Sequence, residues 1–449
     1  MKSVYVKTLG CKVNTFDSHA LENQFKKSGY KLVNQAEQAD ITVINTCSVT
    51  SVAEKEARYL LRRFKRENPD SFRVVTGCYA QIDSATIEQM GEVDFIVPNE
   101  AKERLVPLVE ARLDGKGEPT KFPQDLKQVK NNKQSHFKSS LTLFDSPKTE
   151  RTRAFLKIQD GCNGFCSYCQ IPYARGESRS VPARDVLSEA KNLVNAGVGE
   201  LVLTGIHIGD YGEDAGPEGR GQALFLKLLE DLFALEGLQR LRISSLEPAE
   251  LSQGLIEVLA KYADKFCDHF HLPLQSGDNR ILRLMNRKYD QDRYFESVKM
   301  IREYFPKAQV SADVIPGFPG EDDSAFAETI AFIEKCKLAS LHVFPYSKRP
   351  NTAAIRMPNH LDVEVIKSRA KELRGLSKRL FKDFATGFIG DSALVLWEQF
   401  DQSSGRWQGK TKNYLPVMSE ASFDGAVGQV DEVRLRGFVT EGALLATKS

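Results

Sequence analysis

The chain has 449 residues, of which 41% are hydrophobic and 27% charged, a composition typical of a folded protein with two to four domains. Its formal net charge is only +2, which excludes binding to a polyanion through overall charge, so any nucleic-acid surface must be a local patch. The sequence has neither a signal peptide nor about 18 consecutive apolar residues that would span a bilayer. We therefore expect a cytoplasmic protein without membrane contact, in which eight cysteines indicate metal or redox chemistry rather than disulfides.

Residues 1–112 alternate between strand and helix patterns. Short apolar strands are predicted at 4–9, 41–45, 72–76 and 94–97, and helices at 17–28 and 51–68. Asp17 is the expected N-cap of the first helix. This order predicts a small α/β domain with a mainly parallel sheet. Residues 113–147 are rich in Gly, Pro and polar residues without periodicity, which predicts a linker.

Residues 148–384 resume the alternation and repeat it six times. Strands are predicted at 154–158, 200–204, 240–244, 268–271, 309–315 and 340–344, with helices between them and a long basic helix at 362–386. Six such units predict a partial (β/α)6 barrel. Residues 385–449 contain short strands at 393–398, 407–411, 414–416 and 432–438, which predict a small all-β barrel. The expected fold class is therefore α/β with a C-terminal β-barrel.

Residues 161–169 read GCNGFCSYC and place Cys162, Cys166 and Cys169 in one loop after the first barrel strand. Three thiolates at this spacing can hold three corners of a [4Fe–4S] cluster and leave the fourth iron open to a substrate or cofactor. A zinc knuckle is the alternative, but zinc takes four ligands and no fourth Cys or His is near in the sequence.

A second set of cysteines shares a position rather than a spacing. Cys11, Cys47 and Cys78 each lie just past the end of a predicted strand, and the carboxyl ends of parallel strands meet at one edge of a sheet. Glycines directly before the first and the third permit tight turns. This pattern leaves two interpretations open, a second three-cysteine cluster or three unrelated buried cysteines. We interpret Cys267 and Cys336 as core residues.

Several further motifs support one resemblance. The loop cysteines with Tyr168 before the last of them, and the segments IPYARGESRS (171–180), SSLEP (244–248), HLPLQSG (271–277) and GFPGE (317–321), resemble the radical S-adenosylmethionine (SAM) methylthiotransferase family. The segment TLGCKVN (8–14) is similar to the threonylcarbamoyladenosine tRNA branch of that family. The resemblance covers nearly the whole chain. It departs at Gln170, Asp322 and Asn351, where the family usually has an aliphatic residue, Thr and Gly, and these departures concern only local loop geometry.

This resemblance implies three domains: an N-terminal methylthiotransferase domain at 1–112, a radical SAM core at 148–384 and a C-terminal TRAM domain at 385–449. It also implies two [4Fe–4S] clusters, one on Cys11, Cys47 and Cys78 and one on the loop cysteines, where SAM would bind. The convergence of the first three cysteines therefore follows from the resemblance more firmly than from strand positions.

The activity implied is methylthiolation at C2 of N6-threonylcarbamoyladenosine at position 37 of tRNA, next to the anticodon. In the family, a 5′-deoxyadenosyl radical from SAM removes hydrogen from C2, sulfur held at the N-terminal cluster joins that carbon, and a second SAM supplies the methyl group. The expected partners are the anticodon arm of tRNA and a reductant protein such as flavodoxin or ferredoxin. No catalytic residue beyond the cluster ligands is expected.

Further SAM contacts are expected from Tyr168 and from residues at or near later strand ends, namely Gly205, Glu247, Gln275 and Asp313, because barrel active sites lie there. Each of these residues is equally compatible with a role in supporting the fold.

Two surfaces are candidates for RNA contact, the C-terminal barrel and a basic face of the helix at 51–68. The candidate residues are Lys410, Lys412 and Tyr414 in the barrel and Lys55, Arg58 and Arg62 on the helix. A charged helix face is usually only solvated.

Two other functions stay open on the sequence alone. One is the same chemistry on another tRNA adenosine or on a ribosomal protein side chain. The other, from a different class, is a metal-stabilised RNA-binding module without catalysis.

Overall fold

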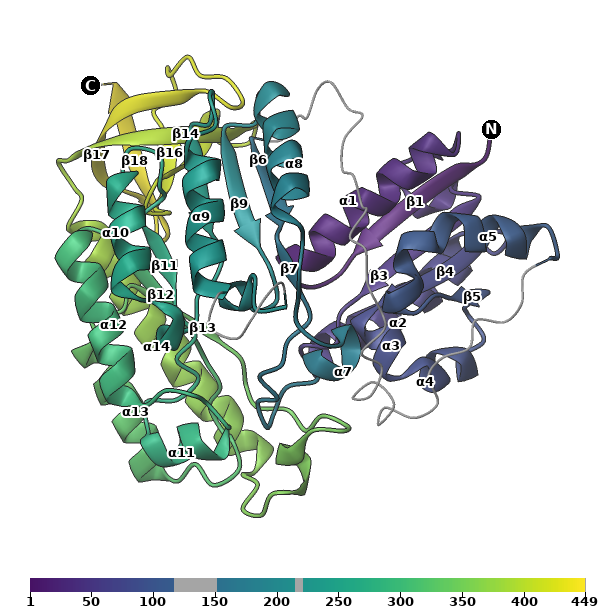
Figure 1. The fold of residues 1–449 in the computed structure, drawn as a ribbon, viewed down its shortest axis with the longest axis horizontal. Helices are drawn as coiled ribbons and strands as arrows, with labels where there is room; N and C mark the ends of the chain where they lie inside the picture. Colours follow the sequence, from purple (N-terminus) through teal and green to yellow (C-terminus); the bar gives the residue numbers. More distant parts are fainter. Residues whose placement is uncertain (117–151, 215–220, 449) are drawn as a thin grey trace. The chain divides into compact units, whose positions relative to one another are not determined.

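The computed structural model of the chain describes residues 1–116, 152–214 and 221–448, which form two compact units (Figure 1). Within these residues, the first unit combines 1–116 with 157–182 and 347–355, and the second contains the rest. The predicted linker at 113–147 falls almost wholly outside the described residues, so the domain boundaries stay predictions. No helix in the described ranges is long and apolar enough to cross a membrane.

The first unit is built on a five-stranded parallel sheet in the order β2-β1-β3-β4-β5. The sequence predicts the other four strands and a mainly parallel sheet, but not β2 or the strand order. The strands are β1 (Ser3–Thr8), β2 (Lys31–Leu32), β3 (Ile41–Thr46), β4 (Phe72–Gly77) and β5 (Phe95–Ile96). The helices are α1 (Lys12–Lys27), α2 (Ser51–Glu67), α3 (Cys78–Ile82), α4 (Ser84–Gln89) and α5 (Leu105–Leu113).

Helices cover both faces of this sheet (Figure 1). Successive residues of β3 enter different cores: Val43 packs in the core that includes Leu21 of α1 and Val109 of α5. Ile44 packs in the core that includes Leu61 of α2. Because both faces are buried, the strand is a continuous apolar run rather than an alternating one.

Helix α1 begins earlier than the sequence predicts. Cys11, in extended conformation, occupies the N-cap position, so the expected N-cap role of Asp17 is wrong. Asp17 lies inside the helix and is buried, where it forms ion pairs with Lys102 and Lys157. A buried carboxylate needs such partners, and both come from segments distant in sequence.

The rest of the first unit includes the loop that carries Cys162, Cys166 and Cys169. Strand β7 (Gln159–Asp160) pairs antiparallel with β8 (Arg179–Ser180), and the short helix α7 (Ile171–Arg175) lies between them in the chain. This pair of short strands was not predicted. It closes the ends of the loop on each other.

The second unit contains the six predicted βα repeats. Strands β6 (Arg153–Lys157, whose last residue belongs to the first unit), β9 (Glu200–Thr204) and β10 (Arg240–Ile243) form one sheet, and β11 (His269–His271), β12 (Gln309–Val314) and β13 (Ser340–Val343) form another. An isolated parallel bridge between Leu241 and Phe266 joins the two at β10. The helices are α8 (Ala183–Asn195), α9 (Gly221–Phe233), α10 (Gln253–Lys261), α11 (Asn279–Leu284), α12 (Gln291–Tyr304), α13 (Asp323–Lys335) and α14 (Val363–Thr386).

A closed five-stranded barrel follows α14, in the order β14-β15-β16-β18-β17. Its strands are β14 (Ser392–Asp401), β15 (Arg406–Thr411), β16 (Pro416–Ser419), β17 (Val430–Thr440) and β18 (Ala443–Lys448). Four strands were predicted, and β18 was missed. Tyr414 was placed in a strand, but it lies in the preceding turn with φ +70°.

Candidate cluster-binding site

Cys11, Cys47 and Cys78, hereafter the N-terminal triad, directly follow or nearly follow the carboxyl ends of β1, β3 and β4. Gly10 has φ +98°, and a Cβ added there would lie 2.6 Å from the Cys47 sulfur. Gly77 has φ +100°, and its Cβ would lie 2.3 Å from a backbone carbonyl oxygen. Only glycine permits these turns and this close approach, so the sheet edge brings the three cysteines together.

Buried polar side chains fasten the three strand ends to one another. The Asn14 amide donates to the carbonyls of Leu9 at 2.8 Å and Thr46 at 2.9 Å. The Thr46 hydroxyl donates to the Thr76 carbonyl at 2.6 Å, and the Asn45 amide donates to the Asn14 carbonyl at 2.9 Å. These bonds hold the backbone beside the triad in place.

The environment of Cys47 disfavours its ionised form. Burial raises the pKa of Cys47 to about 12, and the neighbouring Cys78 and Cys11 add to the rise, whereas the Val49 N–H at 3.4 Å and Arg175 oppose it. A metal that binds a thiol of raised pKa must displace its proton.

Cys162, Cys166 and Cys169, hereafter the loop triad, lie between β7 and α7. The Gly164 N–H donates to the Cys162 sulfur at 3.3 Å, and the N–H of Ile171 donates to the Cys169 sulfur at 3.4 Å. A Cβ at Gly164 would lie 3.3 Å from the Cys162 sulfur and 3.9 Å from that of Cys166, so both sulfurs face this glycine. Backbone N–H···S bonds are a usual means of stabilising cluster thiolates.

The ends of this loop are fixed by backbone contacts. Gly161 has φ +74°, and a Cβ there would lie 1.9 Å from the Glu177 carbonyl oxygen. The N–H of Cys162 donates to the Gly176 carbonyl at 3.1 Å. The loop therefore returns on itself so tightly that a side chain at position 161 is excluded.

The number of thiolates in each triad favours an iron–sulfur cluster over zinc. A structural zinc ion takes four ligands, whereas three cysteines can hold three corners of a [4Fe–4S] cluster and leave its fourth iron open. That each triad holds a cluster stays a prediction.

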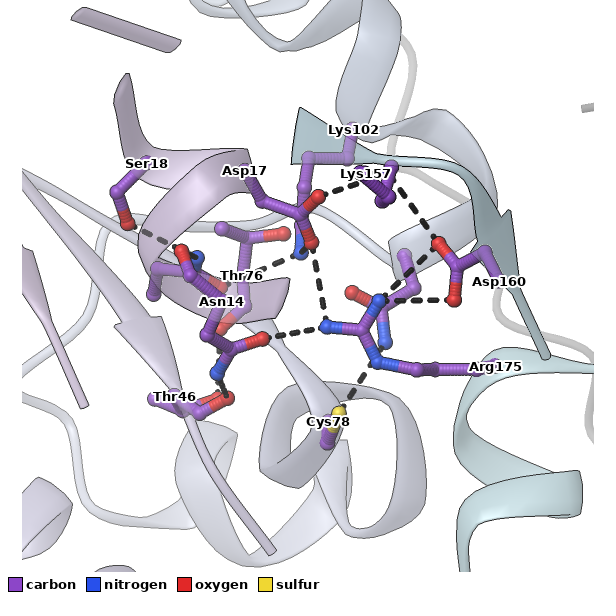
Figure 2. Close-up of polar contacts among 12 residues, drawn as sticks. Asn14, Asp17, Ser18, Thr46, Thr76, Cys78, Lys102, Lys157, Asp160 and Arg175 are labelled. Carbon is purple, nitrogen blue, oxygen red and sulfur yellow. Dashed lines mark hydrogen bonds and ion pairs between the residues drawn. The ribbon is translucent and has the colours of Figure 1, made fainter. Parts of the chain in front are cut away.

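A buried charge network contacts both the N-terminal triad and the loop (Figure 2). Arg175 of α7 bonds to Asp160 at 3.0 Å, Asp17 at 3.2 Å and the Asn14 side chain at 2.5 Å. Lys157 pairs with both carboxylates, at 2.9 Å and 3.3 Å. Burial alone would raise the pKa of Asp17, but its neighbouring cations outweigh that effect and hold the pKa well below its usual range.

A second arginine also joins the two cysteine segments. Arg349 donates through Nε to the Gln170 side chain at 3.1 Å and through its guanidinium to the Ser48 carbonyl. It also pairs with Glu54 at 2.6 Å. Because Ser48 follows Cys47 and Gln170 follows the loop triad, residues 347–355 tie the two sets of ligands together.

The other predicted SAM-contact residues lie in the second unit, except for Tyr168 in the loop. Gly205 follows β9, Glu247 and Gln275 lie beyond the ends of β10 and β11, and Asp313 is near the end of β12. All four thus lie at strand ends as predicted, and their contact with SAM stays a prediction.

Several of these residues have distinctive surroundings. Gln275 adopts φ +65°, which a non-glycine residue rarely does and which often marks a functional position. The Glu247 carboxylate pairs with Arg287, and Asp313 pairs with His271 at 3.1 Å. Arg287 and His271 were not singled out from the sequence, although His271 opens the HLPLQSG motif.

Sequence reasoning also missed a group formed by His207, Asp210 and Glu250 beyond the ends of β9 and β10. The Nδ1 atom of His207 faces Asp210 at 3.1 Å, and its Nε2 faces Glu250. The two ring nitrogens thus contact different carboxylates. The signal in the sequence is a histidine three residues after a predicted strand.

The barrel residues predicted to contact RNA have partners within the second unit. Lys412 donates to the carbonyls of Ala263 and Asp264. The Tyr414 ring stacks on His269 with centroids 4.9 Å apart and lies 4.1 Å from the Lys410 ammonium. These contacts attach the barrel to the neighbouring strands of its unit, and RNA contact by these residues stays a prediction.

The predicted basic face of α2 is more accessible. Lys55 and Arg62 are exposed, whereas Arg58 donates to the Tyr79 hydroxyl at 2.8 Å. Tyr59 lies on the same side of the helix and is 59% exposed. An exposed aromatic ring between cations is the usual composition of a surface that stacks unpaired bases.

Comparisons with known proteins agree with this geometry. Residues 156–333 match the model of the Radical SAM superfamily, and residues 3–98 match that of the Uncharacterized protein family UPF0004. The chain is 38% identical over 440 residues to the threonylcarbamoyladenosine tRNA methylthiotransferase MtaB of Bacillus subtilis, covering 97% of this chain and 94% of that protein. It is 36% identical to the protein of the same name from Aquifex aeolicus, covering 93% and 96%.

The fold is also similar to a solved structure of the radical SAM methyltransferase TsrM from Kitasatospora setae, with a TM-score of 0.60 at 14% identity over 79% of this chain and 75% of that one. The fold and the loop triad define a radical SAM protein, which uses an iron–sulfur cluster and SAM. The chain belongs to the threonylcarbamoyladenosine tRNA methylthiotransferase family.

Proposed function

We propose that the protein attaches a methylthio group to C2 of N6-threonylcarbamoyladenosine at position 37 of tRNA, with one [4Fe–4S] cluster on each triad. The observation that carries the proposal is the placement of both triads in one compact unit. Buried contacts of Arg175 and Arg349 connect the segments that hold them. A metal-stabilised binding module would not need two such triads.

The bound clusters and SAM supply the radical chemistry and the sulfur. The protein's own residues hold and orient these groups. The loop triad would hold the cluster to which SAM binds. Contact of SAM with Tyr168 and with the strand-end residues Gly205, Glu247, Gln275 and Asp313 stays a prediction. A reductant protein such as flavodoxin or ferredoxin delivers electrons, and the reaction takes place in the cytoplasm.

The substrate is tested by offering the anaerobically reconstituted protein two substrates in parallel. One is tRNA that carries threonylcarbamoyladenosine, and the other is ribosomal protein. We expect the methylthio mass increase only in the tRNA nucleosides. Modification of the ribosomal protein instead would show that the substrate is a protein side chain and not tRNA. Iron analysis of the same sample separates both from the non-catalytic alternative, since two clusters give about eight irons per chain.

RNA binding is proposed for the exposed face of α2 together with the C-terminal barrel. The α2 face presents Lys55, Tyr59 and Arg62 to solvent, and the helix begins four residues after Cys47. A nucleotide bound on this face would therefore lie near the N-terminal triad. In the barrel, Lys410, Lys412 and Tyr414 are already engaged in contacts within their unit, so RNA would have to share them.

The double variant Lys55→Glu, Arg62→Glu is expected to weaken tRNA binding by roughly 10–100-fold at low salt, because reversing two exposed charges removes phosphate contacts. Binding is measured as a salt series, and the variant should show a shallower salt dependence than the parent. The matched control is Arg184→Glu, Lys378→Glu, two exposed cations of the second unit (87% and 79% exposed side chains). Equal losses in both variants would show that only overall charge matters, and unchanged affinity in the first would place recognition on the barrel.

A further inference from the structure

The charge network around Arg175 is not balanced. Its buried part contains two carboxylates, Asp17 and Asp160, and three cations, Lys102, Lys157 and Arg175. The side chains of Asp17 and all three cations are at most 3% exposed. Arg179, at 20% exposed, approaches Asp160 to 3.5 Å and adds to the same sign. A buried excess of positive charge is costly unless an anion compensates it.

The excess charge faces the N-terminal triad. Figure 2 shows the Arg175 guanidinium directed at the Cys78 sulfur, and Arg175 interacts electrostatically with Cys11, Cys47 and Cys78. Its Nε is buried and makes no hydrogen bond among the described residues, and the dashed line to Cys78 in Figure 2 marks the electrostatic contact. A thiolate at Cys78 would supply the acceptor that this buried donor lacks.

Lys102 is a second buried cation that acts on the N-terminal triad. It donates to Asp17 at 3.1 Å and to the Asn45 side chain at 3.3 Å, and Cys78 is among the groups that act on its charge. Burial lowers the pKa of Lys102, and the contact with Asp17 opposes this. The Asp17 carboxylate and the Asn45 side-chain oxygen accept two of the three hydrogen bonds that an ammonium group can donate.

An iron–sulfur cluster on the N-terminal triad would supply the negative charge that compensates this excess. Three thiolates on an oxidised [4Fe–4S] core of charge 2+ leave one net negative charge, and reduction by one electron adds a second. We infer that Arg175 is a positioning residue for the N-terminal cluster. Its guanidinium, which comes from the segment after the loop triad, places a positive charge beside Cys78 and makes that cluster easier to reduce. This inference rests on the proposed function, in which the triad binds a second cluster.

The placement of Arg175 gives this role a consequence for the reaction. The residue lies six positions after the last loop cysteine, in the segment that shapes the loop triad. Its contacts to Asn14 and Asp17 reach the helix that starts directly after Cys11. The Arg175 side chain therefore fixes the position of one ligand segment relative to the other. It also places a positive charge beside the cluster that would hold the sulfur.

The test isolates the N-terminal cluster in the full-length chain by replacing the three loop cysteines with alanine. In this parent, Arg175→Gln removes the counter-charge, and Arg175→Lys keeps it. The control is Glu54→Gln, Arg349→Gln, which removes the other buried bridge but leaves net charge unchanged. The readouts are iron content and the cluster's midpoint potential, followed by EPR during a redox titration, so no activity measurement is involved.

We expect Arg175→Gln to shift the midpoint potential to more negative values, because a nearby positive charge favours the reduced cluster. Arg175→Lys should stay close to the parent, and so should the control. Loss of iron in Arg175→Gln with retention in Arg175→Lys supports the same role. An unshifted potential in Arg175→Gln overturns the inference, as do equal shifts in Arg175→Gln and the control, or loss of iron in both Arg175 variants but not in the control. A parent that binds no iron would instead refute the proposed second cluster itself.

Discussion

Replacing Cys162 with alanine is expected to abolish turnover, including the cleavage of SAM, by at least about a hundredfold. Two remaining thiolates cannot hold a cube with one controlled open corner. The Gly164 N–H that donates to the Cys162 sulfur would also lose its acceptor. The measurement is the amount of 5′-deoxyadenosine formed by anaerobically reconstituted protein with a chemical reductant.

The matched control for this variant is Cys336→Ala. Cys336 is buried at the C-cap of α13, and its loss should cost about 1 kcal/mol of packing free energy without affecting cofactor cleavage. Formation of 5′-deoxyadenosine by Cys162→Ala at the parent rate would mean that the loop triad is not the radical site.

Cys47→Ala should separate the two halves of the reaction. We expect the variant to cleave SAM at a rate near that of the parent but to produce no methylthiolated nucleoside, a loss of at least about a hundredfold in product. The reason is that Cys47 follows β3 in the N-terminal sheet, whereas the loop triad has its own backbone and N–H···S support.

The Cys47 experiment needs two readouts on one sample, namely 5′-deoxyadenosine and the modified nucleoside. Iron content should fall to about half, because one of two clusters is lost. Methylthiolation at normal yield would refute the second cluster. Loss of both readouts in a folded protein with half its iron would show that the two clusters do not act independently.

The principle that the carboxyl ends of parallel strands meet at one edge of a sheet accounts for most of what the sequence predicted correctly. Cys11, Cys47 and Cys78 are spread over nearly seventy residues, yet the parallel sheet places all three at one edge. The rule could not predict the side chains between the triads. Asp17 has the features of an N-cap in the sequence, and only the arrival of Lys157 and Arg175 from a distant segment explains why it is buried.

Two departures from the family pattern lie in neighbouring segments of the structure. Gln170 donates to the Pro350 carbonyl at 2.8 Å and accepts from Arg349. Asn351, next in the chain, has φ +64°, a conformation that Asn tolerates better than most residues and that glycine adopts freely. The Gln170 amide thus contacts the two residues that directly precede Asn351, which no single-position comparison could predict.

The third departure is explained locally. Asp322 caps α13, where its side chain accepts from the Ala325 N–H at 2.9 Å. Thr serves the same purpose at an N-cap.

The missed barrel strand β18 (Ala443–Lys448) had a weaker signal in the sequence. Its apolar and polar residues alternate poorly, and its burial comes from pairing with both β16 and β17.

The most direct test of the account is mass spectrometry of nucleosides from total tRNA of a strain that lacks this gene, with and without the gene restored. We predict that 2-methylthio-N6-threonylcarbamoyladenosine disappears, that N6-threonylcarbamoyladenosine accumulates in its place, and that the restored gene reverses both changes whereas its Cys47→Ala form does not. Unchanged 2-methylthio-N6-threonylcarbamoyladenosine in the deletion strain, or the loss of a different methylthiolated nucleoside, would contradict the proposed function.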